Sequence, residues 1–239
     1  MNWIEALILG VIQGLTEFLP VSSSGHLEIG KALLGIELQN NLTFDIIVHA
    51  ATVCSTVIVF RKQLASLLSG VVKFQWNTET QYIAKLLFSA IPVVIIGLSF
   101  EDTIESFFSG DLVLVGSMLL VTATLLSFTY YAKQRDKNIS FIDAFVIGVA
   151  QALAVMPGIS RSGATIATAL ILKNKREEAA RFSFLMVLQV FPLVIGFISA
   201  FLVGLLACKL MIAIVNRSKL IYFAIYCAVV AIITIALSI

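Results

Sequence analysis

The sequence predicts an all-α integral membrane protein, built as an inverted-topology repeat with re-entrant helices. Three observations lead to this fold class. Of the 239 residues, 59% are hydrophobic and only 13% are charged, whereas soluble domains carry roughly 25% charged residues. Several apolar runs are long enough to cross a bilayer core, which takes about 20 helical residues. Two polar segments interrupt the apolar sequence, and they are copies of each other.

The two polar segments are motif 1 (residues 13–26) and motif 2 (residues 151–165). A shift of 138 residues (148 minus 10) places Gly10 on Gly148, and it places Gln13, Ser22, Ser24 and Gly25 on Gln151, Ser160, Ser162 and Gly163. Paired interruptions of this kind mark binding sites in membrane proteins built from repeats. We therefore expect one transmembrane domain over residues 1–239, with repeat 1 at about residues 1–133 and repeat 2 at about residues 138–239.

Four apolar runs are predicted spans: residues 44–60, 83–100, 112–132 and 220–239. Basic side chains gather in loops that the positive-inside tendency assigns to the cytoplasm. These clusters are Arg61/Lys62/Lys73, Lys133/Arg135/Lys137, Lys173/Lys175/Arg176/Arg181 and Lys209/Arg217/Lys219. The loop after residue 100 carries only acidic charges (Glu101, Asp102, Glu105 and Asp111) and is expected outside.

These loop assignments make both motifs re-entrant. Motif 2 lies between two cytoplasmic clusters, so residues 141–169 should enter and leave on one side, as two half-helices joined at Pro157-Gly158. Motif 1 should return to the outside, because the span at residue 44 runs inward. The copies then insert from opposite faces and meet near the midplane, where irregular backbone must line a cavity or be buried in protein. Residues 182–207 are too few for two crossings, so a shortened hairpin around residues 185–196 is expected.

Motif 1 carries acid, base and nucleophile candidates. An ionised Glu17 inside a bilayer costs at least ~2.5 kcal/mol and needs a partner. Gln13 lies on the same helical face, so both side chains can offer oxygens to one ion or water; the alternative is a packing hydrogen bond. The serines at 22, 23 and 24 follow Pro20, where they can cap a new helix whose N–H groups bind anions. Either a serine or His26 could be the nucleophile, with the other carrying its proton.

Motif 2 repeats this design with Arg161, a cation suited to phosphate oxygens. Beside a serine-capped helix start it predicts a phosphate cradle; the alternative is an Arg161–Glu17 ion pair that joins the two halves. His49 is interpreted as a packed or hydrogen-bonded histidine, with a supporting role at the site as the alternative. The cysteines at 54, 208 and 227 lie singly in apolar segments, and the net charge of +2 does not indicate a nucleic-acid partner.

At these residues the chain resembles the bacitracin-resistance family of integral undecaprenyl-diphosphate phosphatases. Motif 1 reads Gln13-x-x-x-Glu17-Phe-Leu-Pro-Val-Ser-Ser-Ser-Gly-His26, and motif 2 ends Pro157-Gly-Ile-Ser-Arg-Ser-Gly-Ala-Thr165. The resemblance covers nearly the whole chain. It implies hydrolysis of undecaprenyl diphosphate to the monophosphate and phosphate, which recycles the lipid carrier for cell-wall synthesis and confers bacitracin resistance. It also implies the bacterial inner membrane, a site open to the outer side, a divalent cation (Mg²⁺ or Ca²⁺) and a possible homodimer.

The resemblance also assigns roles to residues. The catalytic residues would be Glu17, Ser23, His26 and Arg161, and a metal ion would bind Gln13 and Glu17. The substrate would be bound by Ser22, Ser24, Gly25, Ser160, Ser162, Gly163 and Thr165. Ser23 is favoured over His26 as the nucleophile. Two alternatives remain: a transporter or flippase of anionic isoprenyl lipid, which needs no nucleophile, and an inactive relic.

The sequence departs from the family pattern in two places. Position 13 is Gln where many members carry Glu, and an amide cannot take up a proton. In addition, some twenty residues are missing between Phe184 and Gly196, the same region in which the spans do not add up.

Overall fold

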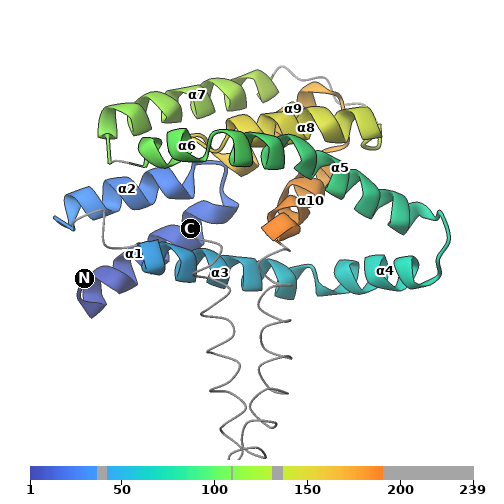
Figure 1. Ribbon diagram of the computed structural model, residues 1–239, viewed down its shortest axis with the longest axis horizontal. Helices are drawn as coiled ribbons and strands as arrows, with labels where there is room; N and C mark the ends of the chain where they lie inside the picture. Colours follow the sequence, from blue (N-terminus) through green and yellow to red (C-terminus); the bar gives the residue numbers. More distant parts are fainter. Residues whose placement is uncertain (37–41, 109, 131–136, 191–239) are drawn as a thin grey trace, which may run out of the picture. The chain divides into compact units, whose positions relative to one another are not determined.

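A computed structural model describes residues 1–36, 42–108, 110–130 and 137–190. Every secondary-structure element named in these residues is a helix (Figure 1). They are α1 (Trp3–Phe18), α2 (Ser23–Leu33), α3 (Leu42–Val59), α4 (Arg61–Val72), α5 (Thr78–Ser99), α6 (Glu101–Phe107), α7 (Leu112–Tyr130), α8 (Phe141–Leu153), α9 (Arg161–Ile171), α10 (Arg176–Met186) and the 3₁₀ helix η2 (Val187–Val190). The chain divides into two compact units, Met1–Gln189 and Val190–Ile239. The span predicted at residues 220–239 and most of the predicted hairpin lie outside the described residues.

In the part of the chain that the structure describes, two helices are long and apolar enough to cross a membrane by themselves, α5 and α7. They confirm as helices the spans predicted at residues 83–100 and 112–132. Their large apolar side chains point outward: Leu98, Val113 and Leu120 are 77%, 78% and 71% exposed. Soluble proteins rarely expose apolar surface of this extent, whereas lipid tails cover it without penalty. The described part is therefore an all-α membrane protein.

The span predicted at residues 44–60 forms α3, and α4 follows it after a sharp bend. The two helices meet at an angle of 74°, and together they are long and apolar enough for one further span. The bend falls at Phe60, immediately before Arg61. A basic residue favours the interface over the bilayer core, so this is a physically reasonable place for a span to turn.

Motifs 1 and 2 each form a pair of short packed helices, α1 with α2 and α8 with α9. The same hydrogen bonds recur at the 138-residue shift. Asn2 and Glu5 form a capping box at α1, as do Ser140 and Asp143 at α8. The next helices are capped by serines: Ser22 accepts from the Gly25 N–H at 3.3 Å, and Ser160 accepts from the Gly163 N–H at 3.0 Å. The sequence repeat is thus also a repeat of local structure.

The turns of the two hairpins touch each other reciprocally. A side chain on Gly25 would meet Gly158 Cα at 3.0 Å, and one on Gly163 would meet Pro20 O at 3.3 Å. The 138-residue shift relates Gly25 to Gly163 and Pro20 to Gly158, so each turn presents the same position to the other. Contacts of this mutual kind arise where two like surfaces meet about a two-fold axis.

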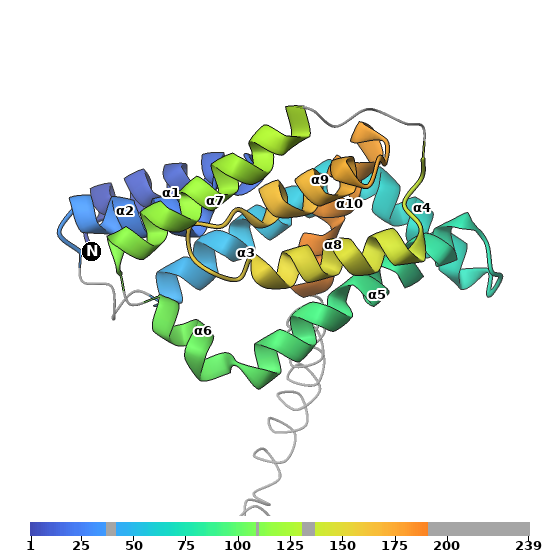
Figure 2. The same cartoon turned by 90° about the horizontal axis from the view of Figure 1, so that it is seen from above.

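Helix α7 holds the second turn in place. Seen from above, α9 lies between α7 and α8 (Figure 2). The buried Thr122 hydroxyl on α7 donates to Gly158 O at 2.9 Å and accepts from the Ser160 N–H at 3.0 Å. Buried side chains of α5, α8, α9 and α10 form the hydrophobic core, in which Ile147, Phe182, Leu185 and Met186 are at most 2% exposed. The start of α9 is therefore fixed by hydrogen bonding to α7, and its end by packing in this core.

Replacing Gly158 should destabilise the fold. Its φ is +96°, and an added Cβ would lie 2.5 Å from Val115 O. We expect Gly158→Ala to lower the free energy of unfolding by about 1–3 kcal/mol, because a non-glycine residue is strained here even before the clash. Thermal unfolding in detergent measures this loss. Gly97→Ala is the control, because apart from its chain neighbours and its own helix backbone no described atom lies within 4 Å of its added Cβ; equal midpoints for both variants would contradict the prediction.

Candidate active site

Motifs 1 and 2 meet at a cavity of about 170 Å³. Motif 1 lines it from the end of α1 and the start of α2, motif 2 from the turn before α9, and α3 adds one side chain. The lining residues are Thr16, Glu17, Ser22, Ser23, Ser24, His49, Ala154, Ile159, Ser160, Arg161 and Ser162. The structure thus brings Glu17, Arg161 and the serines of both motifs together, although the motifs are more than 120 residues apart in sequence.

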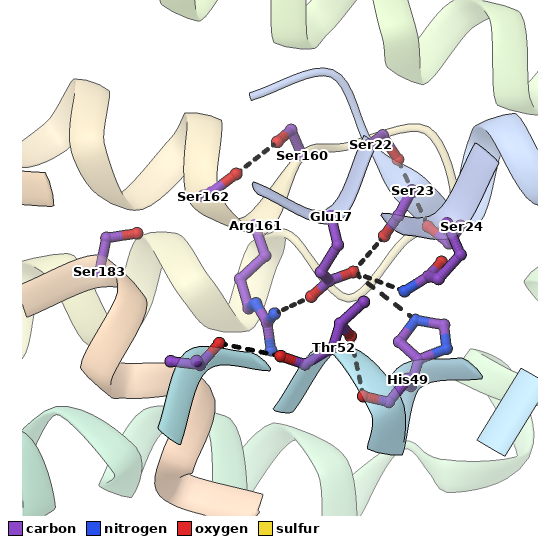
Figure 3. Close-up of polar contacts among 12 residues, drawn as sticks. Glu17, Ser22, Ser23, Ser24, His49, Thr52, Ser160, Arg161, Ser162 and Ser183 are labelled. Atoms are coloured by element: carbon purple, nitrogen blue, oxygen red, sulfur yellow. Dashed lines mark hydrogen bonds and ion pairs between the residues drawn. The ribbon is translucent and has the colours of Figure 1, made fainter. Parts of the chain in front are cut away.

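Glu17 is the residue on which most polar contacts converge (Figure 3). Its Oε1 accepts a hydrogen bond of 2.5 Å from Arg161 Nη2. Its Oε2 accepts from Ser23 Oγ at 2.5 Å and from Gln13 Nε2 at 3.0 Å. Only 7% of the Glu17 side chain is exposed. The guanidinium and the two neutral donors compensate the cost of holding a carboxylate in an apolar environment.

The Arg161–Glu17 ion pair confirms one alternative drawn from the sequence, in which the pair joins the two repeats. The phosphate-cradle alternative is compatible with it. One third of the Arg161 side chain remains exposed. The guanidinium has five N–H donors, and the bond to Glu17 uses only some of them. Arg161 can therefore hold Glu17 in the unliganded protein and still offer N–H groups to an anion in the cavity.

Two helix N-termini also line the cavity. Ser22 caps α2 and Ser160 caps α9, and each cap hydroxyl lies beside a second serine hydroxyl, at 3.3 Å from Ser24 Oγ and 3.2 Å from Ser162 Oγ. Exposed N–H groups and the helix dipole make a helix N-terminus attractive to anions. The cap at Ser22 has φ +68°, in the left-handed region that a serine adopts at a cost. Such strain is typical of residues held in place for function.

Four candidate residues lie behind the cavity wall. Gly25 and Gly163 donate their N–H groups to the cap serines, as described above. Thr165 is 1% exposed, and its hydroxyl bonds Arg161 O at 2.8 Å and Ser183 Oγ at 2.6 Å. The His26 ring nitrogen Nδ1 bonds Ser22 O at 2.8 Å, and His26 does not line the cavity. In this structure Thr165 ties α9 to α10, and His26 supports the first turn of α2.

The histidine at the cavity wall is His49, which the sequence analysis placed mainly in packing. Its Nε2 lies 3.9 Å from Glu17 Oε2. This contact comes from α3 packing against α1, which joins residues 32 positions apart. The only sequence signal was a lone histidine in an apolar helix.

Two comparisons of the sequence with known proteins converge on one family. The bacitracin resistance protein BacA family matches residues 6–233. The chain belongs to the BacA family. Among the relatives of this BacA-family protein are undecaprenyl-diphosphatases of Bacteroides fragilis (52% identity over 263 residues, 100% of this chain and 99% of the relative) and Parabacteroides distasonis (52% over 261 residues, 99% and 98%). An undecaprenyl-diphosphatase of the archaeon Methanosphaera stadtmanae is 37% identical over 279 residues, covering 100% and 99%.

The BacA-family chain is shorter than these relatives. The alignment with the Bacteroides fragilis protein covers 263 positions, whereas the chain has 239 residues, so at least 24 positions (263 minus 239) lack a counterpart here. This length difference agrees with the missing stretch of some twenty residues in the sequence analysis. Most of the region assigned to that gap lies outside the described residues.

The residues of this BacA-family site do not fit a resident divalent cation. In the part of the chain that the structure describes, no three His, Cys, Asp or Glu side chains gather around one point. Gln13 and Glu17 were expected to offer oxygens to one ion. Instead, Gln13 turns its NH₂ toward Glu17, and Arg161 engages the other carboxylate oxygen. Gln13 Oε1 remains as a buried oxygen without a partner among the described atoms, and one amide oxygen does not chelate a cation.

The ion pair between the repeats should respond to substitution as a coupled unit. Arg161→Gln leaves Glu17 buried beside two neutral donors, so we expect the free energy of unfolding to fall by about 1–3 kcal/mol. The double variant Glu17→Gln/Arg161→Gln removes both charges and should recover part of this loss. Thermal unfolding of the two single variants, the double variant and wild type completes a double-mutant cycle. Strictly additive effects would show that the two side chains do not interact.

Proposed function

We propose that this protein hydrolyses undecaprenyl diphosphate to undecaprenyl phosphate and inorganic phosphate in a bacterial inner membrane. The observation that carries the proposal is the placement of Ser23 Oγ, Glu17 and Arg161 in one cavity between two helix N-termini. A hydroxyl nucleophile, a base in contact with it and a phosphate-binding cation are the parts that phosphoryl transfer requires. The product is the lipid carrier for cell-wall polymers, and its regeneration accounts for bacitracin resistance.

The cavity supplies positive potential to the diphosphate. Arg161 provides a permanent cation, and the N-termini of α2 and α9 provide free N–H groups. The hydroxyls of Ser22, Ser24, Ser160 and Ser162 lie beside these N–H groups and can complete the hydrogen bonding of phosphate oxygens. Donors fixed before the substrate arrives stabilise the charge that develops during phosphoryl transfer.

The chemical step starts from the Ser23–Glu17 hydrogen bond of 2.5 Å. Ser23 Oγ forms a bond to the terminal phosphorus while its proton moves to Glu17 Oε2. The bond from that phosphorus to the bridging oxygen breaks, and its electron pair leaves with undecaprenyl phosphate. The proton on Glu17 is released to solvent, which restores the carboxylate. Water then attacks the phosphoserine and places its hydroxyl on phosphorus, while its other proton passes through Glu17 to restore Ser23 Oγ–H. In this scheme Ser23 is the nucleophile, and Glu17 takes the proton role that the sequence analysis gave to His26.

The divalent cation implied by the family resemblance enters this proposal as part of the substrate. A diphosphate in water carries a divalent counter-ion on its phosphate oxygens, and Mg²⁺ is commonly bound through substrate phosphates. The cation would neutralise charge on the leaving phosphate. No step above requires a protein ligand to it.

The proposed topology places this site within the membrane, open to the outer side. The hairpin helices α2, α8 and α9 have 11, 13 and 11 residues, or about 16–20 Å at 1.5 Å per residue, well short of a hydrocarbon core of about 30 Å. The reciprocal contact between the two turns, together with the charges of the flanking loops, supports an inverted repeat with re-entrant hairpins. The isoprenyl chain would remain in lipid while its diphosphate enters between the turns. Homodimer formation remains a prediction.

Phosphate release is the direct test. Purified full-length protein in detergent should release phosphate from undecaprenyl diphosphate when Mg²⁺ is present. Ser23→Ala and Arg161→Ala should each lower kcat/KM by at least about 10²-fold, because each removes a group that acts on the transferring phosphoryl. Ser55→Ala, an exposed hydroxyl on α3, is the matched control and should keep full activity.

The alternative of a lipid transporter predicts a different outcome. Transport needs no activated hydroxyl, so a transporter would move labelled lipid across liposomes without releasing phosphate. Wild-type protein that is folded, binds the lipid and releases no phosphate would refute the hydrolase proposal.

Topology can be tested by cysteine accessibility. In a variant with its three native cysteines replaced, Cys at Asp102 should react with an impermeant maleimide applied outside intact cells. Cys at Asn138, beside the second basic cluster, should react only after the membrane is opened. The same side for both positions would contradict the proposed topology.

A further inference from the structure

We propose that His49 is the second proton carrier of the active site and acts on Ser23 through Glu17. The inference rests on the proposed hydrolase function and adds a residue to it. His49 belongs to neither motif and lies on α3. It acts through another residue, so it is a positioning and proton-accepting group rather than a group that touches the phosphate.

The contacts around Glu17 divide between its two oxygens. Oε1 pairs with Arg161 alone among the described side chains. Oε2 receives the Ser23 hydroxyl at 2.5 Å and faces His49 Nε2 at 3.9 Å. The oxygen that takes the Ser23 proton is therefore the one nearest the imidazole (Figure 3). The gap to His49 is longer than a hydrogen bond of about 2.7–3.2 Å, as catalytic contacts often are before substrate binds.

The other ring nitrogen fixes the chemistry of Nε2. His49 Nδ1 lies 2.8 Å from the main-chain oxygen of Asp45. A carbonyl oxygen only accepts, so Nδ1 carries a hydrogen and donates it. In the neutral ring Nε2 is then the basic nitrogen, and it is directed at Glu17. A hydrogen bond on one ring nitrogen commonly selects the tautomer of a working histidine in this way.

No other side chain on the cavity wall can share this task. Among the described lining residues, His49 is the one group besides Glu17 that can take up a proton; Arg161 stays charged and the rest are hydroxyl or apolar. Gln13 donates to the same Oε2, but an amide cannot take up a proton. The other charged or titratable groups near His49 are Asp45, one turn earlier on α3, and Lys31 and Glu28 on α2. Lys31 and Asp45 form an ion pair with a separation of 2.5 Å, and Glu28 interacts with both.

The proton then moves in two transfers. As Ser23 Oγ bonds to phosphorus and the lipid phosphate leaves, the Ser23 proton passes to Glu17 Oε2 and on to His49 Nε2. Glu17 is again a carboxylate when water attacks the phosphoserine. Water supplies the hydroxyl on phosphorus and, through Glu17, the proton that restores Ser23. The proton on His49 leaves with the phosphate product or to solvent, so one proton is released per turnover.

The first test compares His49→Gln with wild type in the phosphate-release assay over a range of pH. We expect kcat to fall by at least about tenfold while KM changes by less than about threefold, since general acid–base groups contribute 10²–10⁴-fold. The pH profile of kcat should also differ between His49→Gln and wild type, because the amide cannot accept the proton that Glu17 passes on. Gln13→Glu places a second carboxyl group beside Glu17 Oε2. The double variant Gln13→Glu/His49→Gln should therefore be more active than His49→Gln.

A second measurement does not depend on activity. The chain has two histidines, so ¹⁵N-histidine labelling gives two ring systems, and a His26→Gln sample assigns them. The His49 ring should show the tautomer protonated on Nδ1. Glu17→Gln should change the pH titration of His49 in NMR spectra and leave that of His26 unchanged. This readout serves even if His49→Gln fails to fold.

The outcomes separate this inference from the proposed function. If His49→Gln keeps the wild-type kcat and pH profile while Arg161→Ala is inactive, the hydrolase stands and the role of His49 is refuted. An unchanged His49 titration in Glu17→Gln refutes it as well. If wild type releases no phosphate, the proposed function itself fails. The contact between Glu17 and His49 is then tested only by the effect of Glu17→Gln on the NMR titration of His49.

Discussion

The ion pair between Glu17 and Arg161 is the interaction on which the site depends. It joins the last turn of α1 to the first residue of α9, 144 positions apart in sequence. A lone carboxylate or a lone guanidinium at this place would be expensive in an apolar environment. Each therefore requires the other repeat to be folded and docked. Correct association of the two hairpins and assembly of the cavity are one event, because neither hairpin alone can compensate its own charge.

Small residues let the two charges meet. The hairpin turns approach at Gly25 and Gly158 and at Gly163 and Pro20 without any side chain between them. Close approach of backbone at small residues is also the main way that helices associate in lipid, where no hydrophobic effect drives them together. The same contact directs the N-termini of α2 and α9 into one cavity. The packing of the two turns and the proposed anion binding are thus properties of a single arrangement.

The sequence predicted what depends on local pattern. Helices α5 and α7 followed from apolar length, and the capping serines of α2 and α9 followed from the repeated motif. Contacts between distant elements were harder to predict. The place of His49 at the cavity wall depends on how α3 packs on α1, and the hydrogen bond of Thr165 depends on Ser183 of α10. Gln13 shows a finer limit, because its spacing places it beside Glu17 but does not determine whether the amide oxygen or the NH₂ faces the carboxylate.

Substrate entry changes the balance at Glu17. A diphosphate carries more negative charge than one carboxylate, and it reaches a guanidinium that is still partly exposed. In the proposed mechanism, the phosphate oxygens draw Arg161, so Glu17 loses part of its compensating charge and accepts the Ser23 proton more readily. The same guanidinium would then stabilise the phosphoryl group that Ser23 attacks. Because the Arg161–Glu17 pair occupies one oxygen of the carboxylate, the proposed mechanism ties activation of the serine to the arrival of a phosphate that competes for Arg161.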